Sequence, residues 1–452
     1  MPINQTGAHI DTAAHEYSDE WRVVPLASVA DIRFSSVNKV SQPGEQPVRL
    51  CNYTDVYNND YITADMDFMR ATATRSEIER FVLQVGDVII TKDSETPDDI
   101  GISAVVDTTA PDVVCGYHLA LLRPNREEVD PTFLAKQLAH HRIARYFGQQ
   151  ANGSTRYSLS TAAIANALLH LPRRENQRSA SVLMRLVDTH ITQTEAVIAK
   201  LKQVRAGMLH DLLSYGLDEN GQLRDPIAHP EQFKDSPLGR LPRTWEHGAV
   251  GDLADLSVGP AFQSHFFATG EGVRLLRGIN VTQGRLRWDK EITQCWTKIT
   301  PALHCYKMEV GDVVIGMDGA LVGRNVALLS NDDVPSYLVQ RVARLRVRED
   351  LESNYLFLYL SSHRFLKHVD IRKTHTAIPH ICGGDIREFK IVVPPISEQR
   401  AILHKVDSID SQIDTESSEL EKLQSLKSGL QDDLLTGRVR VPETIMEGAA
   451  VA

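Results

Sequence analysis

LLHLPRRENQRSASVLMRLVDTHITQTEAVIAKLKQVRAGMLHDLLSYG at residues 168–216 and FKIVVPPISEQRAILHKVDSIDSQIDTESSELEKLQSLKSGLQDDLLTG at residues 389–437 decide the fold, because the second stretch repeats the first. Placing Gly207 on Gly429 gives an offset of 222 residues. The same offset aligns Pro172 with Pro394, Gln177 with Gln399, Asp188 with Asp410, and Leu212-Leu213 with Leu434-Leu435. This spacing is far longer than a solenoid repeat, so the chain contains two copies of one large unit.

Both stretches carry a coiled-coil pattern, in which apolar residues recur at alternating steps of four and three. No proline interrupts either pattern, and each predicts a helix of about 35 residues, roughly 50 Å long. Polar interruptions fall at equivalent positions, Thr194 with Glu416 and Arg205 with Lys427. The matching stripes predict one antiparallel rod, with two separate helices on their own domains as the alternative. The expected rod residues are Met184, Val187, Ile191, Ile198, Leu201, Met208, Leu212, Ile402, Val406, Ile409, Ile413, Leu420, Leu423, Leu430 and Leu434.

A strand-rich segment precedes each helix and is also repeated. VGDVIITKD at 85–93 resembles VGDVVIGMD at 310–318, and a tryptophan, Trp21 or Trp245, opens each copy. Outside this frame the two copies differ greatly. The sequence therefore predicts an α+β fold with two tandem domains, two long antiparallel helices and a pseudo-two-fold internal repeat. The expected strands are Asp87–Thr91, Ile102–Val106, Val113–Leu122, Val273–Leu276, Asp312–Ile315, Asn325–Leu329 and Val339–Val347, with helices at Pro131–Tyr146 and Tyr355–Lys367.

The repeats divide the chain, together with a linker rich in proline, glycine and charge. Glycine follows the last apolar pair of each helix, as expected of a helix C-cap. We expect a flexible tail at 1–20, a first domain at 21–175, a first spacer helix at 176–216, a linker at 217–241, a second domain at 242–395, a second spacer helix at 396–437 and a C-terminal tail at 438–452.

The composition is ordinary for a globular protein, with 24% charged and 42% hydrophobic residues. No apolar run is long enough to span a membrane and residues 1–20 lack a signal-peptide core, so we expect a cytoplasmic protein. The five cysteines form no CxxC pair, which favours free thiols over a disulfide or zinc framework. A net charge of −10 argues against a protein that grips DNA alone, but not against a reading module within a larger assembly.

Three motifs carry a resemblance to a known family. They are the run LLSYGLDENGQLRDPIAHPEQFKDSPLGRLPRTWE at 212–246, PPISEQRAIL at 394–403 and LLTGRVRV at 434–441. Together with the tandem architecture, they resemble the specificity subunits of type I restriction-modification enzymes. The first copy has PRRENQR at 172–178 in place of the PP-x-x-EQ form, which leaves open whether both helices begin with identical packing.

The resemblance implies two target-recognition domains, each reading one half of a bipartite site in double-stranded DNA. The rod would set the unread gap and would dock two methyltransferase subunits, which carry S-adenosylmethionine. Restriction subunits, which use ATP and magnesium, would join for cleavage. This chain itself would bind no cofactor, would have no catalytic residue and would not contact a membrane.

The sequence lacks motifs for catalysis by this chain. It has neither the glycine-rich loop and Asn/Asp-Pro-Pro-aromatic loop of a methyltransferase nor the phosphate loop of an ATPase. The acidic run at 87–95 with Lys92 suggests a metal-dependent nuclease, but the second copy has Met317 in place of Lys92. We therefore assign turn-forming roles to Asp87 and Asp312.

Two further alternatives concern metal binding and partners. We expect His140 and His141 to lie on neighbouring faces of a helix without a carboxylate at metal spacing, so that no metal site forms. A coiled-coil scaffold, or a decayed relative that binds only proteins, would account for the rod but not for two large domains beside it.

Base edges and phosphates are contacted by basic, amide and hydroxyl side chains on exposed loops. The loop at 152–157 and its equivalent at 374–379 occupy the same place in both copies, between a helix and the exit strand. The DNA-contact candidates are Lys92, Arg145, Asn152, Ser154, Thr155, Arg156 and Tyr157 in the first domain, and Arg277, Asn280, Arg324, Arg341, Arg372, Lys373, Thr374, His375 and Thr376 in the second.

Overall fold

The computed structural model describes residues 21–441, so the tail expected at 1–20 and most of the one expected at 438–452 lie outside the described residues. The chain divides into two units. Within the described range, unit 1 comprises residues 21–196 and 417–441, and unit 2 comprises residues 197–416. No helix within 21–441 is long and apolar enough to cross a membrane.

Unit 1 is built on a five-stranded sheet in the order β2-β10-β6-β8-β4, with a second sheet in the order β5-β3-β9. Its strands are β1 (Arg22–Pro25), β2 (Ala30–Phe34), β3 (Gln46–Cys51), β4 (Tyr61–Ile62), β5 (Met69–Ala73), β6 (Val88–Thr91), β7 (Asp93–Ser94), β8 (Ser103–Val106), β9 (Val113–Cys115), β10 (Leu119–Pro124), β11 (Asn152–Gly153), β12 (Tyr157–Ser158) and β13 (Leu168–Leu171). Its short helices are α1 (Tyr53–Tyr57), α2 (Arg75–Phe81), α3 (Pro131–Ala139), α4 (His141–Gln150) and α5 (Thr161–Ala165).

Unit 2 repeats this plan with a four-stranded sheet in the order β17-β23-β20-β21 and a second sheet in the order β19-β18-β22. Its strands are β14 (Phe233–Ser236), β15 (Gly239–Pro242), β16 (Glu246–Ala249), β17 (Ala254–Val258), β18 (Val273–Leu276), β19 (Cys295–Trp296), β20 (Val313–Gly316), β21 (Val326–Leu328), β22 (Ser336–Leu338), β23 (Val342–Val347) and β24 (Lys390–Val393). Its short helices are α7 (Val250–Leu253), α8 (Ser353–Leu360), α9 (His363–Arg372) and α10 (Gly383–Arg387). In each unit the entry strand pairs with the exit strand, β1 with β13 and β16 with β24.

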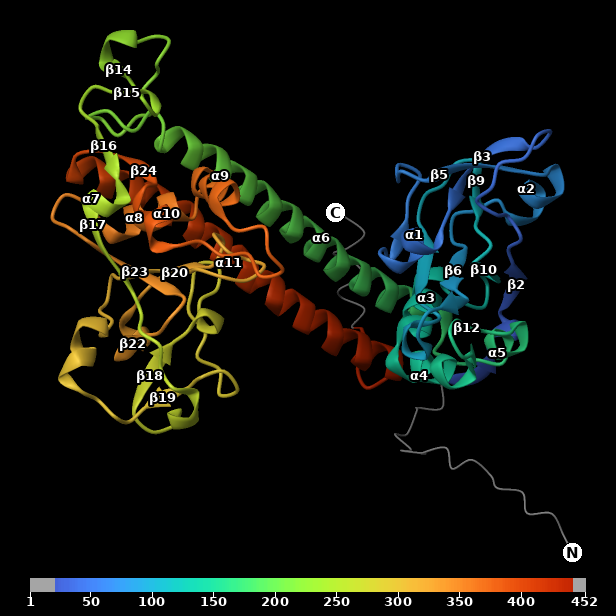
Figure 1. Cartoon of the computed structure of the whole chain (residues 1–452). Helices are drawn as coiled ribbons and strands as arrows, with labels where there is room; N and C mark the ends of the chain where they lie inside the picture. The colour runs from blue at the N-terminus through green and yellow to red at the C-terminus, as the bar shows by residue number, and fades with distance from the viewer. Residues whose placement is uncertain (1–20, 442–452) are drawn as a thin grey trace, which may run out of the picture. The chain divides into compact units, whose positions relative to one another are not determined.

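Two long helices, α6 (Arg174–Leu212, 39 residues) and α11 (Ile396–Thr436, 41 residues), are each divided between the two units (Figure 1). In unit 1, Asp188 of α6 pairs with Lys427 of α11 at 2.8 Å. In unit 2, Arg205 Nη2 donates to Asp410 Oδ2 at 2.8 Å. Residue numbers rise along α6 as they fall along α11, so the helices are antiparallel. The predicted α+β class and antiparallel helices are confirmed.

These two ion pairs are equivalents under the repeat, because both the two acids and the two bases are separated by 222 residues. The polar interruptions of the apolar pattern at Arg205 and Lys427 therefore meet acids across the seam, which fixes the register of the helices. The residues expected in the rod are buried or half-buried throughout, and Met184, Leu212, Ile402 and Leu434 are among the most deeply buried.

Both long helices begin in the same way despite the different sequences at their starts. Gln177 Nε2 donates to the Pro172 carbonyl at 2.9 Å, and its Oε1 accepts from the Asp130 amide at 2.9 Å. Gln399 does the same with Pro394 at 2.8 Å and the Glu352 amide at 2.9 Å. Both glutamines are buried, so the missing PP-x-x-EQ form does not change this packing.

The helix ends are also alike. Gly216 and Gly437 have φ values of 65° and 76°, the left-handed conformation that glycine adopts at a helix C-cap. A Cβ at Gly216 would overlap the ring of Trp245, and one at Gly437 would overlap the ring of Trp21. The predicted glycine caps are confirmed, and a tryptophan packs against each of them.

Both expected domain helices are split in the structure. The stretch Pro131–Tyr146 is interrupted at His140, whose ψ of 139° is extended and which caps the start of α4. Likewise Tyr355–Lys367 is divided at Ser361 and Ser362, between α8 and α9. Apolar periodicity continues across both breaks, which is why the sequence predicted single helices.

Two strand predictions were also too long. Val113–Leu122 forms β9 and β10, which lie in different sheets and are joined by residues 116–118. The strand expected at Val339–Val347 begins only at Val342, because Arg341 has a φ of 66° and breaks the extended backbone. All five cysteines are free, as predicted.

Candidate DNA-recognition edges

In unit 1, the predicted loop at 152–157 lies at the end of the central strand β6. Strands β11 and β12, which flank the loop, form a small sheet with β7, and Tyr157 stands opposite Ser94. The Leu159 amide donates to the Lys92 carbonyl at 2.8 Å. The structure thus brings the loop and Lys92 together, and the side chains at 152–156 are exposed.

Asp93 is the charged centre of this edge. Its Oδ2 accepts from Lys92 Nζ at 3.0 Å and lies 2.8 Å from His118 Nδ1. Lys92 Nζ also lies 5.5 Å from the centre of the Phe34 ring. The ammonium group of Lys92 is therefore engaged within the domain, with a side-chain exposure of 17%.

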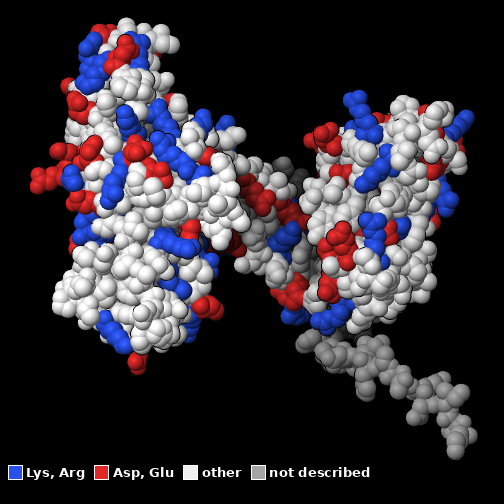
Figure 2. Space-filling view, in the orientation of Figure 1, with Lys and Arg blue, Asp and Glu red and all other residues white. Residues whose placement is uncertain are grey.

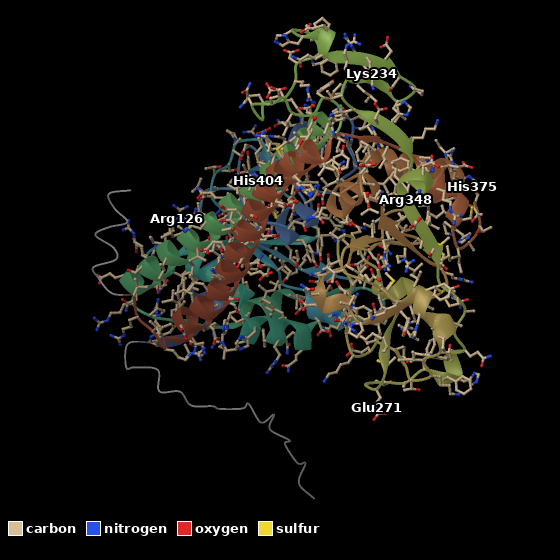
Figure 3. All side chains as sticks on the ribbon, turned by 90° about the vertical axis from the view of Figure 1, so that its left-hand side faces the viewer. Arg126, Lys234, Glu271, Arg348, His375 and His404 are labelled. Atoms are coloured by element: carbon tan, nitrogen blue, oxygen red, sulfur yellow. The ribbon has the colours of Figure 1, made fainter. Side chains whose placement is uncertain are left out.

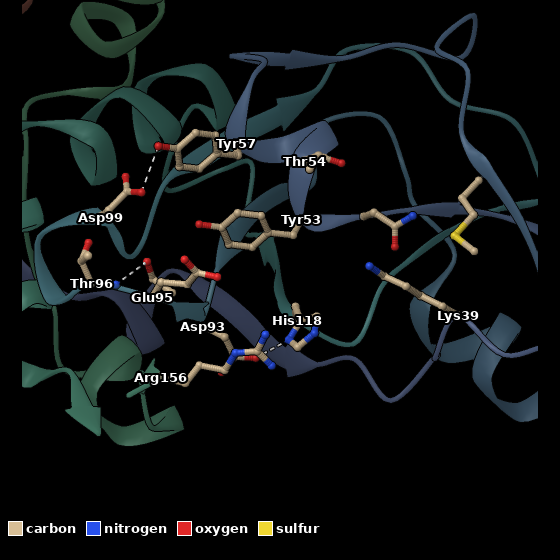
Figure 4. A pocket seen from close by; sticks show the side chains of 13 residues that line it. Lys39, Tyr53, Thr54, Tyr57, Asp93, Glu95, Thr96, Asp99, His118 and Arg156 are labelled. Atoms are coloured by element: carbon tan, nitrogen blue, oxygen red, sulfur yellow. Dashed lines mark hydrogen bonds and ion pairs between the residues drawn. The ribbon is translucent and has the colours of Figure 1, made fainter. Parts of the chain in front are cut away.

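A pocket of about 650 Å³ opens beside Asp93, with Arg156 at its border (Figure 4). The rings of Tyr53 and Tyr57 stack at 5.5 Å, and the Tyr57 hydroxyl donates to Asp99 at 2.9 Å. Burial raises the pKa of Tyr53, so its hydroxyl stays protonated at neutral pH. These residues could not be predicted from the sequence, because α1 is distant in sequence from the loop and carries no motif.

Unit 2 places its predicted loop at the equivalent edge. His380 stands opposite Asp318, as Ser158 stands opposite Asp93 in unit 1. The Gly319 amide donates to the Pro379 carbonyl at 3.0 Å. Inside the loop, the His380 amide donates to Thr374 Oγ1 at 3.0 Å. Figure 3 shows His375 at the periphery of unit 2, pointing away from the domain.

Arg341 takes the place that His118 has in unit 1, directly before the longest strand of its sheet. Its guanidinium pairs with Asp318 at 2.7 Å, and its side chain is 65% exposed. Arg341 is the residue other than glycine that has a positive φ within 21–441. A left-handed backbone costs energy for an arginine, and such positions concentrate at functional sites.

The other candidates in unit 2 differ in position. The prediction that Asn280 contacts DNA needs a correction. Its side chain is fully buried, accepts a hydrogen bond from the Arg277 amide and donates one to the Arg287 carbonyl at 2.9 Å. It is therefore not available to a base edge. Arg277 is half-buried, and it donates to the Ile292 carbonyl at 2.5 Å.

The remaining candidates are basic residues, and all but Lys373 are exposed. Arg145 lies on α4, and Arg324 precedes β21. Arg372 ends α9 and lies 3.6 Å from Glu388. Lys373 is half-buried and pairs with Asp370 at 2.7 Å. The structure brings Arg372 and Lys373 next to the loop at 374–379.

The turn-forming roles assigned to two buried aspartates are confirmed. Asp87 Oδ2 accepts from the Gln84 amide at 2.8 Å and pairs with Arg123 at 2.8 Å. Asp312 does the same with the Glu309 amide at 2.8 Å and with Arg346 at 2.7 Å. Each acid thus ties a turn to a neighbouring strand.

The expectation for His140 and His141 needs a correction. Asp432 of α11 supplies a carboxylate that the sequence did not reveal, and its Oδ1 lies 3.2 Å from His140 Nε2. Atoms of the three residues that could ligate a metal lie within 4.8 Å of one another. Burial lowers the pKa of His140 to about 4, and Arg438 pairs with Asp432, so a cation already occupies one side of this acid.

The geometry defines a class of protein: two equivalent α+β domains that present different loops at equivalent edges, each joined to both helices of an antiparallel pair. Residues 242–425 match the family model described as type I restriction modification DNA specificity domain. This range of the chain is thus a DNA specificity domain of that type, and the chain is similar to type I restriction enzyme specificity subunits.

Individual relatives agree with this assignment. The MjaVIII specificity subunit of Methanocaldococcus jannaschii is 27% identical over 281 residues, which cover 61% of this chain and 63% of that protein. The MjaX specificity subunit of the same organism is 24% identical over 379 residues, 81% of each chain. The solved structure of a type I restriction-modification S subunit from M. genitalium is similar in fold, with a TM-score of 0.55 at 14% identity over 92% of this chain and 96% of that one. The chain thus spans just under two thirds of the first relative.

Proposed function

We propose that this chain is the DNA-sequence specificity subunit of a type I restriction-modification complex. The observation that carries the proposal is the pair of equivalent edges, where Asp93 in unit 1 and Asp318 in unit 2 anchor loops of different sequence. A constant frame with variable loops suits two modules that read different halves of a bipartite site. Specific reading requires side chains at base edges, and both loops expose hydroxyl and basic groups.

The long helices would set the distance between the half-sites and dock two methyltransferase subunits. Helix α6 has 39 residues and is therefore about 58 Å long. One heptad inserted at matching positions of α6 and α11 adds about 10 Å, which corresponds to roughly three base pairs. We expect the unread gap to grow by that amount, and an unchanged gap would contradict the role of the rod as a ruler.

Chemistry would come from the partners rather than from this chain. The methyltransferase subunits would bring S-adenosylmethionine, and restriction subunits would bring ATP and magnesium. The acids most suggestive of catalysis, Asp87 and Asp312, are each held by an arginine in a turn. A purified chain without partners is expected to bind DNA weakly and to modify none.

The decisive experiment is to co-express the chain with the methyltransferase and to map methylated adenines in host DNA by single-molecule sequencing. A bipartite motif with a fixed gap, lost when this chain is omitted, is the expected result. A stable complex without methylation would point instead to a decayed or antagonistic subunit. Failure to form a complex would favour a scaffold that binds other proteins.

A further inference from the structure

Unit 2 contains a basic groove that no sequence motif indicates. The groove has a volume of about 500 Å³ and lies between one face of α9, the segment from Glu388 to Lys390, and Leu238 of the β14–β15 turn. Figure 2 shows Lys and Arg side chains gathered over the part of unit 2 where α9 and α10 lie in Figure 1. The lining residues are Leu238, Arg364, His368, Ile371, Arg372, Glu388, Phe389 and Lys390.

Three permanent cations face one carboxylate in this groove. Arg372 pairs with Glu388 at 3.6 Å, and the other two cations are Arg364 and Lys390. Neither of these two makes an ion pair with any residue between 21 and 441, and both are exposed. The groove therefore has an excess of positive charge, although the chain as a whole carries −10.

The floor of the groove is closely packed. Phe389 is buried and packs edge-on against Phe365 at 5.0 Å between ring centres. His368 lies 5.0 Å from the same ring and forms a hydrogen bond of 2.6 Å with the Asp385 carbonyl. Burial lowers the pKa of His368, so this histidine is neutral and supports the floor rather than adding charge. Arg364 and Arg372 project from a helix face that is fixed in place, which reduces the entropy lost on binding an anion.

The basic residues of the groove are not all repeated in unit 1. At an offset of 222 residues, Gln150 and Leu168 in unit 1 stand where unit 2 has Arg372 and Lys390. Arg142 corresponds to Arg364, but it donates to Gln137 Oε1 at 3.0 Å within unit 1. The two units share one fold, so the fold alone does not account for the basic residues that line the groove in unit 2.

We propose that this groove binds backbone phosphates of DNA next to the half-site read by the second domain. Arg372 and Lys373 directly precede the loop at 374–379, so the groove continues the predicted reading edge along α9. Arginine pairs with phosphate oxygens in a bidentate manner, and lysine adds a point charge. These contacts position the duplex without reading its sequence. The inference rests on the proposed function, since it requires that the second domain binds DNA.

The test measures the salt dependence of DNA binding by the complete complex with its methyltransferase subunits. The double variant Arg364→Gln/Lys390→Gln removes the two unpaired cations without touching the loop. Each lost phosphate contact lowers the slope of log K against log salt by about 0.9, so the double variant should lose about 1.8. Affinity should fall equally on target and unrelated DNA, and the methylated motif should stay the same.

The control is Lys290→Gln/Lys298→Gln, which changes the net charge equally at exposed sites of unit 2 outside the groove. A slope that falls no more in the groove variant than in this control would overturn the inference. An unchanged slope with weaker binding of the methyltransferase subunits would do the same, by assigning the groove to a protein partner. If the complex without substitutions showed no preference for any DNA motif, the proposed function itself would be refuted.

Discussion

The two halves of the rod carry equivalent ion pairs in different surroundings. In unit 1, Lys136 is 5% exposed and lies 2.7 Å from both Asp60 and Asp188, and Lys427 lies 2.8 Å from both acids. The Tyr61 hydroxyl also donates to Asp188 at 2.8 Å. In unit 2, the corresponding Asp410 forms a single ion pair within residues 21–441, with Arg205 across the seam, and Leu358 stands in the place of Lys136.

The difference shows that the helix pairing and the attachment of a domain to the helices are separate interactions. The acid and base across the seam belong to the repeated frame. The second lysine, Asp60 and Tyr61 belong to the domain of unit 1 and tie it to the rod through charge. Burial disfavours the charged form of Lys427, but Asp60 and Asp188 outweigh burial and raise its pKa. Unit 2 uses apolar packing of α8 against α11 instead, with Leu356 and Val406 in one core.

The largest effect is expected from Asp188→Ala. The substitution leaves Lys136, which is almost fully buried, with only Asp60 as a partner, and breaking a buried ion network costs about 3–5 kcal/mol. Asp410→Ala is the matched control in unit 2. Arg205 keeps access to water there, so the cost should be about 1 kcal/mol. Urea unfolding of both variants checks this, and equal losses would contradict the distinction between the two halves.

The next effect concerns a feature that the two units share. Gln177→Ala and Gln399→Ala each leave buried backbone groups without partners, including the Asp130 or Glu352 amide. We expect each substitution to reduce the free energy of unfolding by about 2–3 kcal/mol. Calorimetry of both variants should give similar losses, and a clear inequality would show that the two helix starts are not equivalent.

Acid should weaken unit 1 through His140. The unfolded chain takes up a proton near pH 6.5, whereas burial holds the folded pKa at about 4, so stability is full above pH 6.5 and declines as the pH falls towards 4. The loss should reach about 2 kcal/mol, and His140→Gln should reduce it. His170, whose pKa is also lowered to about 4 by burial, would leave part of the dependence. Unit 2 has Ser362 at the position of His140 and serves as the internal comparison.

The smallest effect is expected from Lys92→Met, which gives unit 1 the residue that unit 2 has at this position. Asp93 keeps its contact with His118, so the loss of stability should stay below about 1 kcal/mol. If Lys92 contacts DNA, binding to the first half-site should weaken while the fold persists. Thermal melting and a binding assay on the same variant separate the two contributions.

Repetition made much of this fold predictable from the sequence. Matching polar positions at Arg205 and Lys427 indicated a paired rod, but their partners Asp410 and Asp188 became apparent only in the structure. The helix break at His140 was not predicted. The partner of its side chain, Asp432, lies almost three hundred positions away in the sequence. Loops at the recognition edges were placed by their position between a helix and the exit strand. Their neighbours, such as Tyr53, and the burial of Asn280 depend on packing that no local pattern encodes.

The division of the chain between the units also has a consequence for synthesis on the ribosome. Unit 2 is one continuous segment, residues 197–416, whereas unit 1 needs residues beyond 416 to complete its core. Leu434 and Leu435 pack into that core, and Gln137 Nε2 donates to the Leu435 carbonyl at 2.9 Å. Domains commonly fold in the order in which they are translated. Here the domain that is made first must wait for the last helix to emerge, so the second domain can finish folding before the first.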